Sequence, residues 1–344
     1  MSKKGIPAII AFSLLFCGFI ISVYAAADKN ESSIEVFFND PGSKNKDRTL
    51  QDMILSEINN AGDRIYVATY NFTDPKSAEA LIKAVRRGVE VRLVIHSENA
   101  NNDSIRKMDK GGVHIVESVS DGLMHAKYIV IDKNLTICGS ANMTPGSFFY
   151  DNNYMFRIIS PEVNAIFRDE FNEMFIDKKF GSNSPKSKPA ANITLDDGTR
   201  LLIRFSPEDG INNTLLSLVN AAKESIYVLA YSFASNDLGQ ALIDRYDEGA
   251  DVIVVFEEEK AFTDSGGEAE FLKRAGVPIY LDGNDDNLMH EKVFIFDESI
   301  VSAGSYNFTR SAETRNDEQV LIIQNEKIVD AFMDEFDKIY EDAK

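Results

Sequence analysis

A histidine–lysine pair is the part of this sequence best suited to chemistry, because it occurs twice with the same surroundings. His-x-Lys opens the segment His125–Asp132 and, 165 positions later, the segment His290–Asp297. The residues beyond repeat at the same offset, since Gly139–Thr144 corresponds to Gly304–Thr309. The chain has four histidines in all, so two such matches indicate a duplicated site rather than chance.

Side chains in this pattern can bind and cleave a phosphodiester. His125 and Lys127 are two residues apart at the start of an apolar, strand-like run, so their side chains project from one face. Imidazole, ammonium, amide and hydroxyl groups together provide an excess of donors and positive charge, which suits a phosphodiester. The predicted phosphate-binding or supporting side chains are Lys127, Ser140 and Asn142 in the first copy and Lys292, Ser305 and Asn307 in the second.

Two histidines in one site can divide the work of phosphoryl transfer. One imidazole attacks while the other protonates the leaving oxygen, and the lysines and asparagines stabilise charge on the non-bridging oxygens. No clustered His/Cys set and no Asp-x-Asp pattern accompanies the histidines, so we expect no metal and no other cofactor. Asp132 and Asp297 lie at the end of each apolar run that is distant from the histidine and lysine. This position favours a structural role for them, as charge partners or turn formers.

The elements that must position these residues are also duplicated. Apolar residues at helical spacing alternate with short apolar runs in the order helix, strand, helix, strand. This alternation predicts an α/β fold in which each half has a mixed, largely parallel sheet flanked by helices. The expected segments are 50–61, 65–70, 78–87 and 89–95 in the first half and 214–222, 226–231, 238–248 and 251–256 in the second.

The sequence divides into a leader, two halves and a linker. Lys3 and Lys4 precede an uncharged run at residues 5–27 that ends in three alanines, which predicts a signal peptide or an uncleaved membrane anchor. We therefore expect an exported protein, periplasmic or secreted. The first half spans residues 34–178 and the second 199–344. Between them, 179–198 is rich in Gly, Ser and Pro without an apolar period, as in a linker.

Composition excludes several classes of protein. The chain has 344 residues, of which 44% are hydrophobic and 26% charged, so it is not largely disordered. Its net charge of −19 argues against broad phosphate neutralisation on duplex nucleic acid. Cys138 is the one cysteine outside the leader, so no disulfide forms within a processed chain, and its apolar surroundings indicate a small core residue.

The pattern His-x-Lys-x4-Asp-x6-Gly-Ser-x-Asn, present twice, closely resembles the signature of the phospholipase D superfamily. The resemblance implies two α/β halves packed as a pseudo-dimer with both motifs in one cleft, so that a monomer is complete. It also implies a covalent phosphohistidine intermediate. By this resemblance the catalytic set is His125, Lys127, Asp132, His290, Lys292 and Asp297.

The two copies differ at one position of that pattern. The family commonly has an acidic residue there that orients a motif histidine, and Glu318 fits it, whereas the first copy has Asn153. Asp151 is a substitute candidate. We expect the carboxylate-paired imidazole to have the higher, raised pKa, and His125 to be the nucleophile, as in related two-motif enzymes.

Three functions remain open from the sequence, because this superfamily hosts different substrates on one scaffold. A phospholipase D that hydrolyses phospholipid head groups at a membrane surface is favoured by the leader. A metal-independent endonuclease acting on single-stranded nucleic acid is the alternative, and a catalytically silent binding module is disfavoured by the intact motifs. Phe148, Phe149 and Tyr150 are candidates for an apolar lip or for core residues.

Overall fold

The computed structural model describes residues 31–39, 41, 49–185, 192–263, 266–284 and 287–344. The predicted leader, residues 1–27, lies outside this range. Among the described residues, no helix combines the length and the apolar character needed to cross a membrane.

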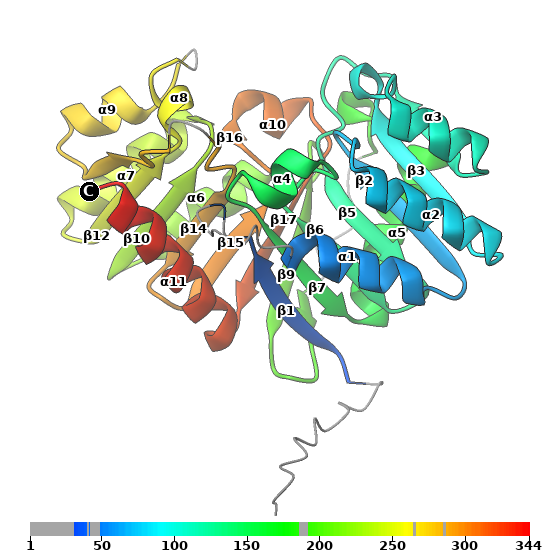
Figure 1. Cartoon of the computed structure of the whole chain (residues 1–344). Coiled ribbons are helices and arrows are strands. Elements are labelled where there is room, and N and C mark those ends of the chain that lie inside the picture. Colours follow the sequence, from blue (N-terminus) through cyan, green and yellow to red (C-terminus); the bar gives the residue numbers. More distant parts are fainter. Residues whose placement is uncertain (1–30, 40, 42–48, 186–191, 264–265, 285–286) are drawn as a thin grey trace, which may run out of the picture. The chain divides into compact units, whose positions relative to one another are not determined.

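Each half contains its own sheet and its own set of helices (Figure 1). The elements of the first half are β1 (Ser33–Phe38), α1 (Thr49–Asn60), β2 (Arg64–Thr69), α2 (Pro75–Arg86), β3 (Glu90–His96), η1 (Ser97–Asn99), α3 (Asp103–Lys110), β4 (His114–Ser118), β5 (Lys127–Ile131), β6 (Leu135–Gly139), α4 (Pro145–Phe149), β7 (Tyr154–Ile159) and α5 (Pro161–Phe175).

The later elements repeat much of this order. They are η2 (Gly181–Asn183), β8 (Asn192–Thr194), β9 (Arg200–Ser206), α6 (Ile211–Ala221), β10 (Ser225–Ala230), β11 (Phe233–Ala234), α7 (Asn236–Asp247), β12 (Asp251–Phe256), α8 (Glu258–Ala261), α9 (Ala269–Arg274), β13 (Ile279–Leu281), β14 (Lys292–Phe296), β15 (Ile300–Gly304), β16 (Phe308–Thr309), α10 (Arg310–Thr314), β17 (Glu318–Gln324) and α11 (Glu326–Asp342). Every helix and strand expected from the apolar spacing is present, with ends shifted by a few residues.

The sheets are mixed, as predicted, but less parallel than expected. The first runs β1-β7-β6-β5-β2-β3-β4 and the second β13-β12-β10-β14-β15-β17-β9-β8. Parallel pairing is confined to β2–β3–β4 and β10–β12–β13, and all other neighbours in these two sheets pair antiparallel. The reason is that helices connect the parallel strands, whereas β5–β6 and β14–β15 are joined by tight turns, which return the chain antiparallel.

Helices cover both faces of each sheet, and the inner faces share one core. The outer faces bury the apolar stripes of α1, α2 and α3 in the first half and α6, α7 and α9 in the second. Between the sheets, α5 and α11 contribute to a core that contains residues of both halves. Aromatic pairs join the halves there, with ring centroids of Phe167 and Phe205 5.3 Å apart and those of Phe38 and Phe332 5.0 Å apart.

The halves are also joined through their backbones beside the motifs. Met124, just before His125, forms a bridge with Asp317, and Asn152 forms a bridge with Met289, just before His290. Residues 31–344 accordingly cluster as one unit. The predicted linker is not free of structure, because it contains η2 and the edge strand β8, in which Ile193 is buried against the shared core.

Candidate active site

Both histidine–lysine pairs lie at the strand edge where the halves meet. Lys127 begins β5 opposite Thr69 at the carboxyl end of β2, and Lys292 begins β14 opposite Ala230 at the end of β10. Ligand sites in α/β sheets gather at the carboxyl ends of parallel strands. The central antiparallel strand of each half therefore delivers its His-x-Lys pair to that edge.

His125 is oriented by a residue of the other half. Its Nδ1 lies 2.8 Å from Oε2 and 3.0 Å from Oε1 of Glu318, and both side chains are buried. Ser305 Oγ donates to Glu318 Oε2 at 2.6 Å, and Asn316 Nδ2 donates to Oε1 at 3.2 Å. This network fixes the carboxylate, so a proton on Nδ1 leaves Nε2 of His125 with a free lone pair.

The second histidine has an amide partner in the matching place. His290 Nδ1 lies 3.1 Å from Oδ1 of Asn153, and Ser140 Oγ donates to the same oxygen at 2.9 Å. Asn153 is fully buried. Asp151 is not the orienter, since its Oδ1 accepts from Leu288 N at 3.3 Å. Ser140 and Ser305 therefore support the orienting residues.

Burial dominates the electrostatics of the imidazoles. It lowers the pKa of His125 to about 4, although the Glu318 carboxylate acts in the opposite direction. Burial, together with the charges of Lys292, Lys127 and His125, lowers the pKa of His290 well below its usual range. The expected contribution of Glu318 is present, but the net raised pKa predicted for its partner is wrong, because the cost of burying a charge is larger.

The lysines of both halves belong to the same electrostatic site. Lys127 Nζ donates to the backbone oxygen of His125, and Lys292 Nζ donates to that of His290 at 2.7 Å. Burial lowers the pKa of Lys127 to about 7, and burial with the charge of Lys127 lowers the pKa of Lys292 well below its usual range. An anion between these groups would relieve their mutual repulsion.

The asparagines lie in matching turns after β6 and β15. Asn142 O accepts from Thr144 N at 2.8 Å, and Asn307 O accepts from Thr309 N at 2.7 Å. Both side-chain Oδ1 atoms are buried, with no hydrogen-bond partner among the described residues. The preceding glycine, Gly139 or Gly304, is required because a Cβ there would collide with the backbone of the neighbouring strand.

Asp132 and Asp297 do not belong to the catalytic set, which corrects the assignment taken from the family motif. Asp132 Oδ1 accepts from Asp63 N at 2.7 Å, and Asp297 Oδ1 accepts from Glu224 N at 2.7 Å. Each carboxylate also accepts from neighbouring backbone N–H groups at the opposite end of the strand from its motif lysine. They are structural residues that close the turn before β2 or β10.

Two tyrosines that the motifs did not identify complete the walls of the site. The ring of Tyr70 lies edge-on to His125 at 5.2 Å between centroids, and that of Tyr231 lies edge-on to His290 at 4.7 Å. Lys292 Nζ is 4.4 Å from the centre of the Tyr231 ring. The expected strand segments 65–70 and 226–231 each end in one of these tyrosines, and this shared position is the signal in the sequence. They fit roles in packing the imidazoles and holding the lysines by cation–π attraction.

The residue after each orienter ties the halves together. Gln319 Nε2 donates to Gly139 O at 2.9 Å, and its Oε1 accepts from Lys127 N at 3.0 Å. In the matching place Tyr154 OH accepts from Gly304 N at 2.7 Å. These buried contacts hold β17 against the motif strands of the first half and β7 against the end of β15 in the second.

The other two histidines, Cys138 and the aromatic lip candidates lie outside the two motifs. His96 is buried and stacks on Tyr70 at 5.2 Å, so it packs behind the site. His114 is exposed on β4, and Cys138 lies in the shared core. Of the three lip candidates, Phe148 is fully buried, Phe149 is partly buried against the core, and Tyr150 is exposed.

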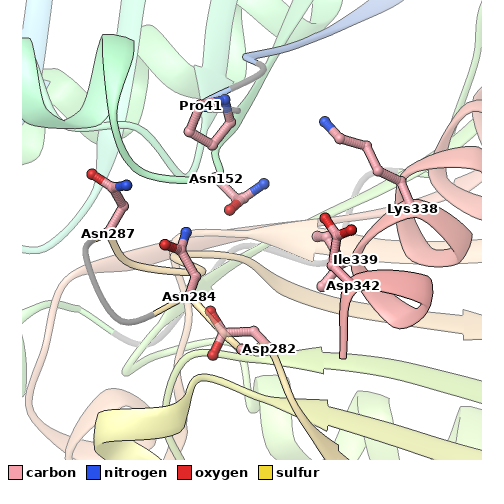
Figure 2. Close-up of a pocket in the computed structure, with 9 residues that line it drawn as sticks. Pro41, Asn152, Asp282, Asn284, Asn287, Lys338, Ile339 and Asp342 are labelled. Carbon is pink, nitrogen blue, oxygen red and sulfur yellow. The ribbon is translucent and has the colours of Figure 1, made fainter. Parts of the chain in front are cut away.

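A polar cavity of about 380 Å³ lies near the second motif (Figure 2). Asn152, whose backbone oxygen accepts from His290 N at 3.1 Å, contributes to its wall. Asp282, directly after β13, is buried there with Oδ2 unpartnered among the described residues, and burial raises its pKa to about 6. Figure 2 shows the amides of Asn284 and Asn287 on the same lining as the α11 side chain of Lys338.

Comparisons with known proteins match both halves. The domain family described as "Cardiolipin synthase, PLD-like domain" matches residues 54–175 and 215–340. A phospholipase D of Rickettsia bellii (strain RML369-C) is 27% identical over 155 residues, covering 45% of this chain and 76% of that protein. The mitochondrial cardiolipin hydrolase of Homo sapiens is 32% identical over 127 residues, covering 37% of this chain and 50% of that protein.

A solved structure has a fold similar to that of this chain over most of its length. The phosphatidylserine synthase of Haemophilus influenzae Rd KW20 superposes with a TM-score of 0.68 at 12% identity, covering 91% of this chain and 88% of that chain. At this identity the match concerns the two-half architecture alone.

Proposed function

Because this chain belongs to the phospholipase D superfamily and is a phosphodiester hydrolase of that class, we propose that it hydrolyses phospholipid head groups through a phosphohistidine. The observation that carries the proposal is the exchange of orienting residues between the halves. Glu318 holds His125, and Asn153 holds His290. One imidazole is thereby prepared for attack beside the other.

The first step forms the covalent intermediate. Nε2 of His125 attacks phosphorus, the bond from phosphorus to the head-group oxygen breaks, and protonated His290 gives its proton to that oxygen. The anionic phosphodiester favours the protonated form of His290, which burial alone opposes. Lys127 and Lys292, with the amides of Asn142 and Asn307, stabilise the charge on the non-bridging oxygens.

The second step uses the same residues in reverse. Neutral His290 takes a proton from water, the water oxygen attacks phosphorus, and the phosphorus–nitrogen bond to His125 breaks. The product is a phosphatidic acid, and both imidazoles return to their starting states. Glu318 stabilises the positive charge that develops on the His125 ring while that ring carries the phosphoryl group.

Three observations support a lipid over a nucleic acid. The named relatives are a phospholipase D and a cardiolipin hydrolase. Leu123, two residues before His125, is exposed, and Val119 in the same loop is 84% exposed, which offers apolar contact near the site. Residues 199–344 carry 13 basic and 30 acidic side chains, a net charge of −17 that repels polyanions.

The polar cavity beside Asn152 is suited to the head group. Its amides and the carboxylate of Asp282 can accept and donate hydrogen bonds to hydroxyl or amine groups, while the phosphate stays with the motifs. In this proposal Leu123 and Val119 face the acyl chains, and the cavity takes the hydrophilic end. An Asp282→Asn variant would then change the relative KM values for choline and glycerol head groups.

Location and assembly follow from the same proposal. The predicted leader would export the protein or anchor it beside a bilayer, and a single chain would suffice for activity because both motifs lie in it. Amino-terminal sequencing of protein recovered from the producing cells distinguishes cleavage after residue 27 from retention. Titration of activity against chain concentration tests the monomer, since an obligate dimer would lose specific activity on dilution.

One head-to-head assay tests the function. Purified full chain is offered phosphatidylcholine, cardiolipin, single-stranded DNA and RNA, with His125→Ala and His290→Ala as controls. We expect lipid turnover that both substitutions abolish. Cleavage of nucleic acid without lipid turnover would establish the endonuclease alternative instead, and activity that survives either substitution would remove the mechanism.

A further inference from the structure

Exposed apolar side chains gather at the sheet edge that carries the two motifs. Val119 follows the parallel strand β4, and Phe262 follows α8, which comes after the parallel strand β12. Leu123 and Tyr150 lie in the loops that enter β5 and β7 from the same edge, along which α4 and α8 lie in Figure 1. In the part of the chain that the structure describes, the large apolar side chains that are exposed are Val119, Leu123, Tyr150, Ile176, Phe262 and Phe271. Such a concentration at one edge indicates a contact surface.

A third chain segment brings Ile176 to the same place. Ile176 directly follows α5 and is 59% exposed. Further along this segment, Gly181 N donates to Asp317 Oδ1 at 2.6 Å, and Asp317 N donates to Leu123 O at 2.9 Å. Asp317 O in turn accepts from His125 N at 2.9 Å. Residues 119–123, 176–181 and 315–317 therefore meet directly beside the first motif histidine.

Tight backbone packing fixes these three segments to one another. Leu123 N donates to Asn316 Oδ1 at 3.0 Å. A Cβ on Gly122 or on Gly181 would collide with the backbone oxygen of Arg315, so glycine is what allows the segments to approach so closely. The apolar side chains of these segments are therefore presented by a well-packed surface.

Basic side chains accompany the apolar ones in these segments. Lys178, Lys179 and Arg315 are exposed, together with the acidic side chains of Asp121 and Asp177. This basic excess is a local exception in a chain with a net charge of −19. We define the docking patch by its apolar and basic members, which are Val119, Leu123, Ile176, Lys178, Lys179 and Arg315.

The other end of the same edge is acidic. Glu258 and Glu259 are exposed close to Phe262 in the sequence, and residues 199–344 carry most of the net negative charge. An anionic surface is therefore repelled at that end and attracted at the docking patch. Charge thus determines which part of the edge can make the contact.

We propose that the docking patch binds an anionic phospholipid bilayer and holds the first motif against it. Apolar side chains at such an interface enter the boundary between head groups and acyl chains, while lysine and arginine reach the lipid phosphates. A protein partner would cover the segments beside His125, whereas a bilayer there supplies the substrate of the proposed reaction. The role of the patch rests on the proposed hydrolysis of phospholipids, but its binding to a bilayer requires no turnover.

Tryptophan reporters test the orientation of the bound protein. The chain has no tryptophan, so Ile176→Trp and Val119→Trp each introduce a single reporter at the docking patch. Lys133→Trp places the same reporter at the opposite edge, beside the turn that Asp132 closes. Each substitution is made in the full chain together with His125→Ala, so that the vesicles are not hydrolysed.

We expect vesicles of equal parts phosphatidylcholine and phosphatidylglycerol to shift the emission of both patch reporters to shorter wavelength. Lipids brominated near the head-group end of the acyl chain should quench this emission, because docked apolar side chains lie about 5–10 Å into the interface. The emission of Lys133→Trp should respond to neither. Equal quenching of all three reporters, or quenching of none, would overturn the proposal.

Charge variants test whether the contact is specific to the patch. Lys178→Gln combined with Lys179→Gln should weaken binding to these vesicles by roughly tenfold to thirtyfold, the loss expected for two basic side chains near an anionic surface. The matched control, Lys133→Gln combined with Lys223→Gln, removes the same charge at the opposite edge and should keep most of the affinity. Vesicle cosedimentation measures both. Equal losses in the two pairs would contradict a specific patch.

These outcomes are separate from the test of the proposed function. Docking of the patch reporters, without lipid turnover by the original chain, would reject the phospholipase and support the docking patch. Turnover of phospholipid without docking of the reporters would reject the docking patch alone.

Discussion

The Glu318 carboxylate, in the second half, lies 2.8 Å from Nδ1 of His125, in the first half. The matching amide, Asn153 in the first half, lies 3.1 Å from Nδ1 of His290 in the second. Each motif is thus completed by the opposite half. The duplicated chain has diverged at this pair, so two similar imidazoles have different partners and can take different roles.

Glu318→Gln should reduce kcat strongly while leaving lipid binding in place. The amide keeps the shape of the side chain but removes the charge that stabilises a positive His125 ring, and it can select the wrong tautomer. A loss of about 10² to 10⁴-fold is expected by analogy with other oriented catalytic histidines. Initial rates at saturating substrate measure it, with exposed Asp337→Asn as the matched control.

Trapping the phosphoenzyme checks the assignment behind that prediction. Mapping of the phosphorylated peptide at alkaline pH, where a phosphorus–nitrogen bond survives, should place phosphate on His125. Phosphate on His290 would reverse the two roles, and a kcat of Glu318→Gln within threefold of the original would show that the contact has no part in catalysis.

Asn153→Asp should shift the alkaline limb of the pH–rate profile upward. A carboxylate at 3.1 Å from Nδ1 stabilises the protonated form of His290 and so raises its pKa. His290 must be protonated to act as the acid, so the active fraction would persist to higher pH. Measurement of kcat from pH 5 to 9 tests this, and an unmoved alkaline limb would mean that another group is the acid.

Much of the fold and of the site could be predicted because the relevant signals are local. Two residues of separation on a strand are sufficient to place His125 and Lys127 on one face, and the repeat locates the second copy. The sequence overestimates the number of parallel strand pairs, because strands alternate with helices along only one edge of each sheet. The tight turn after Asp132 instead joins β5 and β6 as an antiparallel hairpin.

The pairing between halves depends on packing that no local pattern contains. The spacing identifies Glu318 and Asn153 as orienting residues. It does not predict that each one holds the histidine of the other half. The carboxylate of Asp132 illustrates the opposite case: its place in the motif suggests catalysis, while its contacts with the backbone of Asp63 and Arg64 show a turn. The tyrosines were missed because aromatic residues at strand ends are more often core residues.

Asp132→Asn should lower stability without lowering kcat. Asp132 has a left-handed backbone with φ 51°, which Asn tolerates, so the variant isolates the loss of charge-assisted bonds to three backbone N–H groups. We expect a loss of about 1–3 kcal/mol in the free energy of unfolding, measured by denaturant titration. Activity per folded molecule should stay within twofold, and a hundredfold fall would return Asp132 to the catalytic set.

His125→Gln should reduce the acid sensitivity of the fold. Burial lowers the pKa of His125 to about 4, against about 6.5 in the unfolded chain. Between these values the unfolded state holds a proton that the folded state lacks, so stability is complete above pH 6.5 and falls toward pH 4.

For His125 this difference in pKa lowers the free energy of unfolding by on the order of 3 kcal/mol between pH 6.5 and pH 4. Other buried groups act in the same range, since the raised pKa of Asp282, about 6, favours the folded state in acid. The comparison is therefore made as a difference between the original chain and the variant, by denaturant unfolding at half-unit steps from pH 4 to 7. The difference in unfolding free energy between the original chain and His125→Gln should change by about 3 kcal/mol between pH 6.5 and pH 4. The exposed variant His114→Gln should follow the curve of the original chain. Parallel curves for His125→Gln would show that the imidazole is not buried in the neutral form.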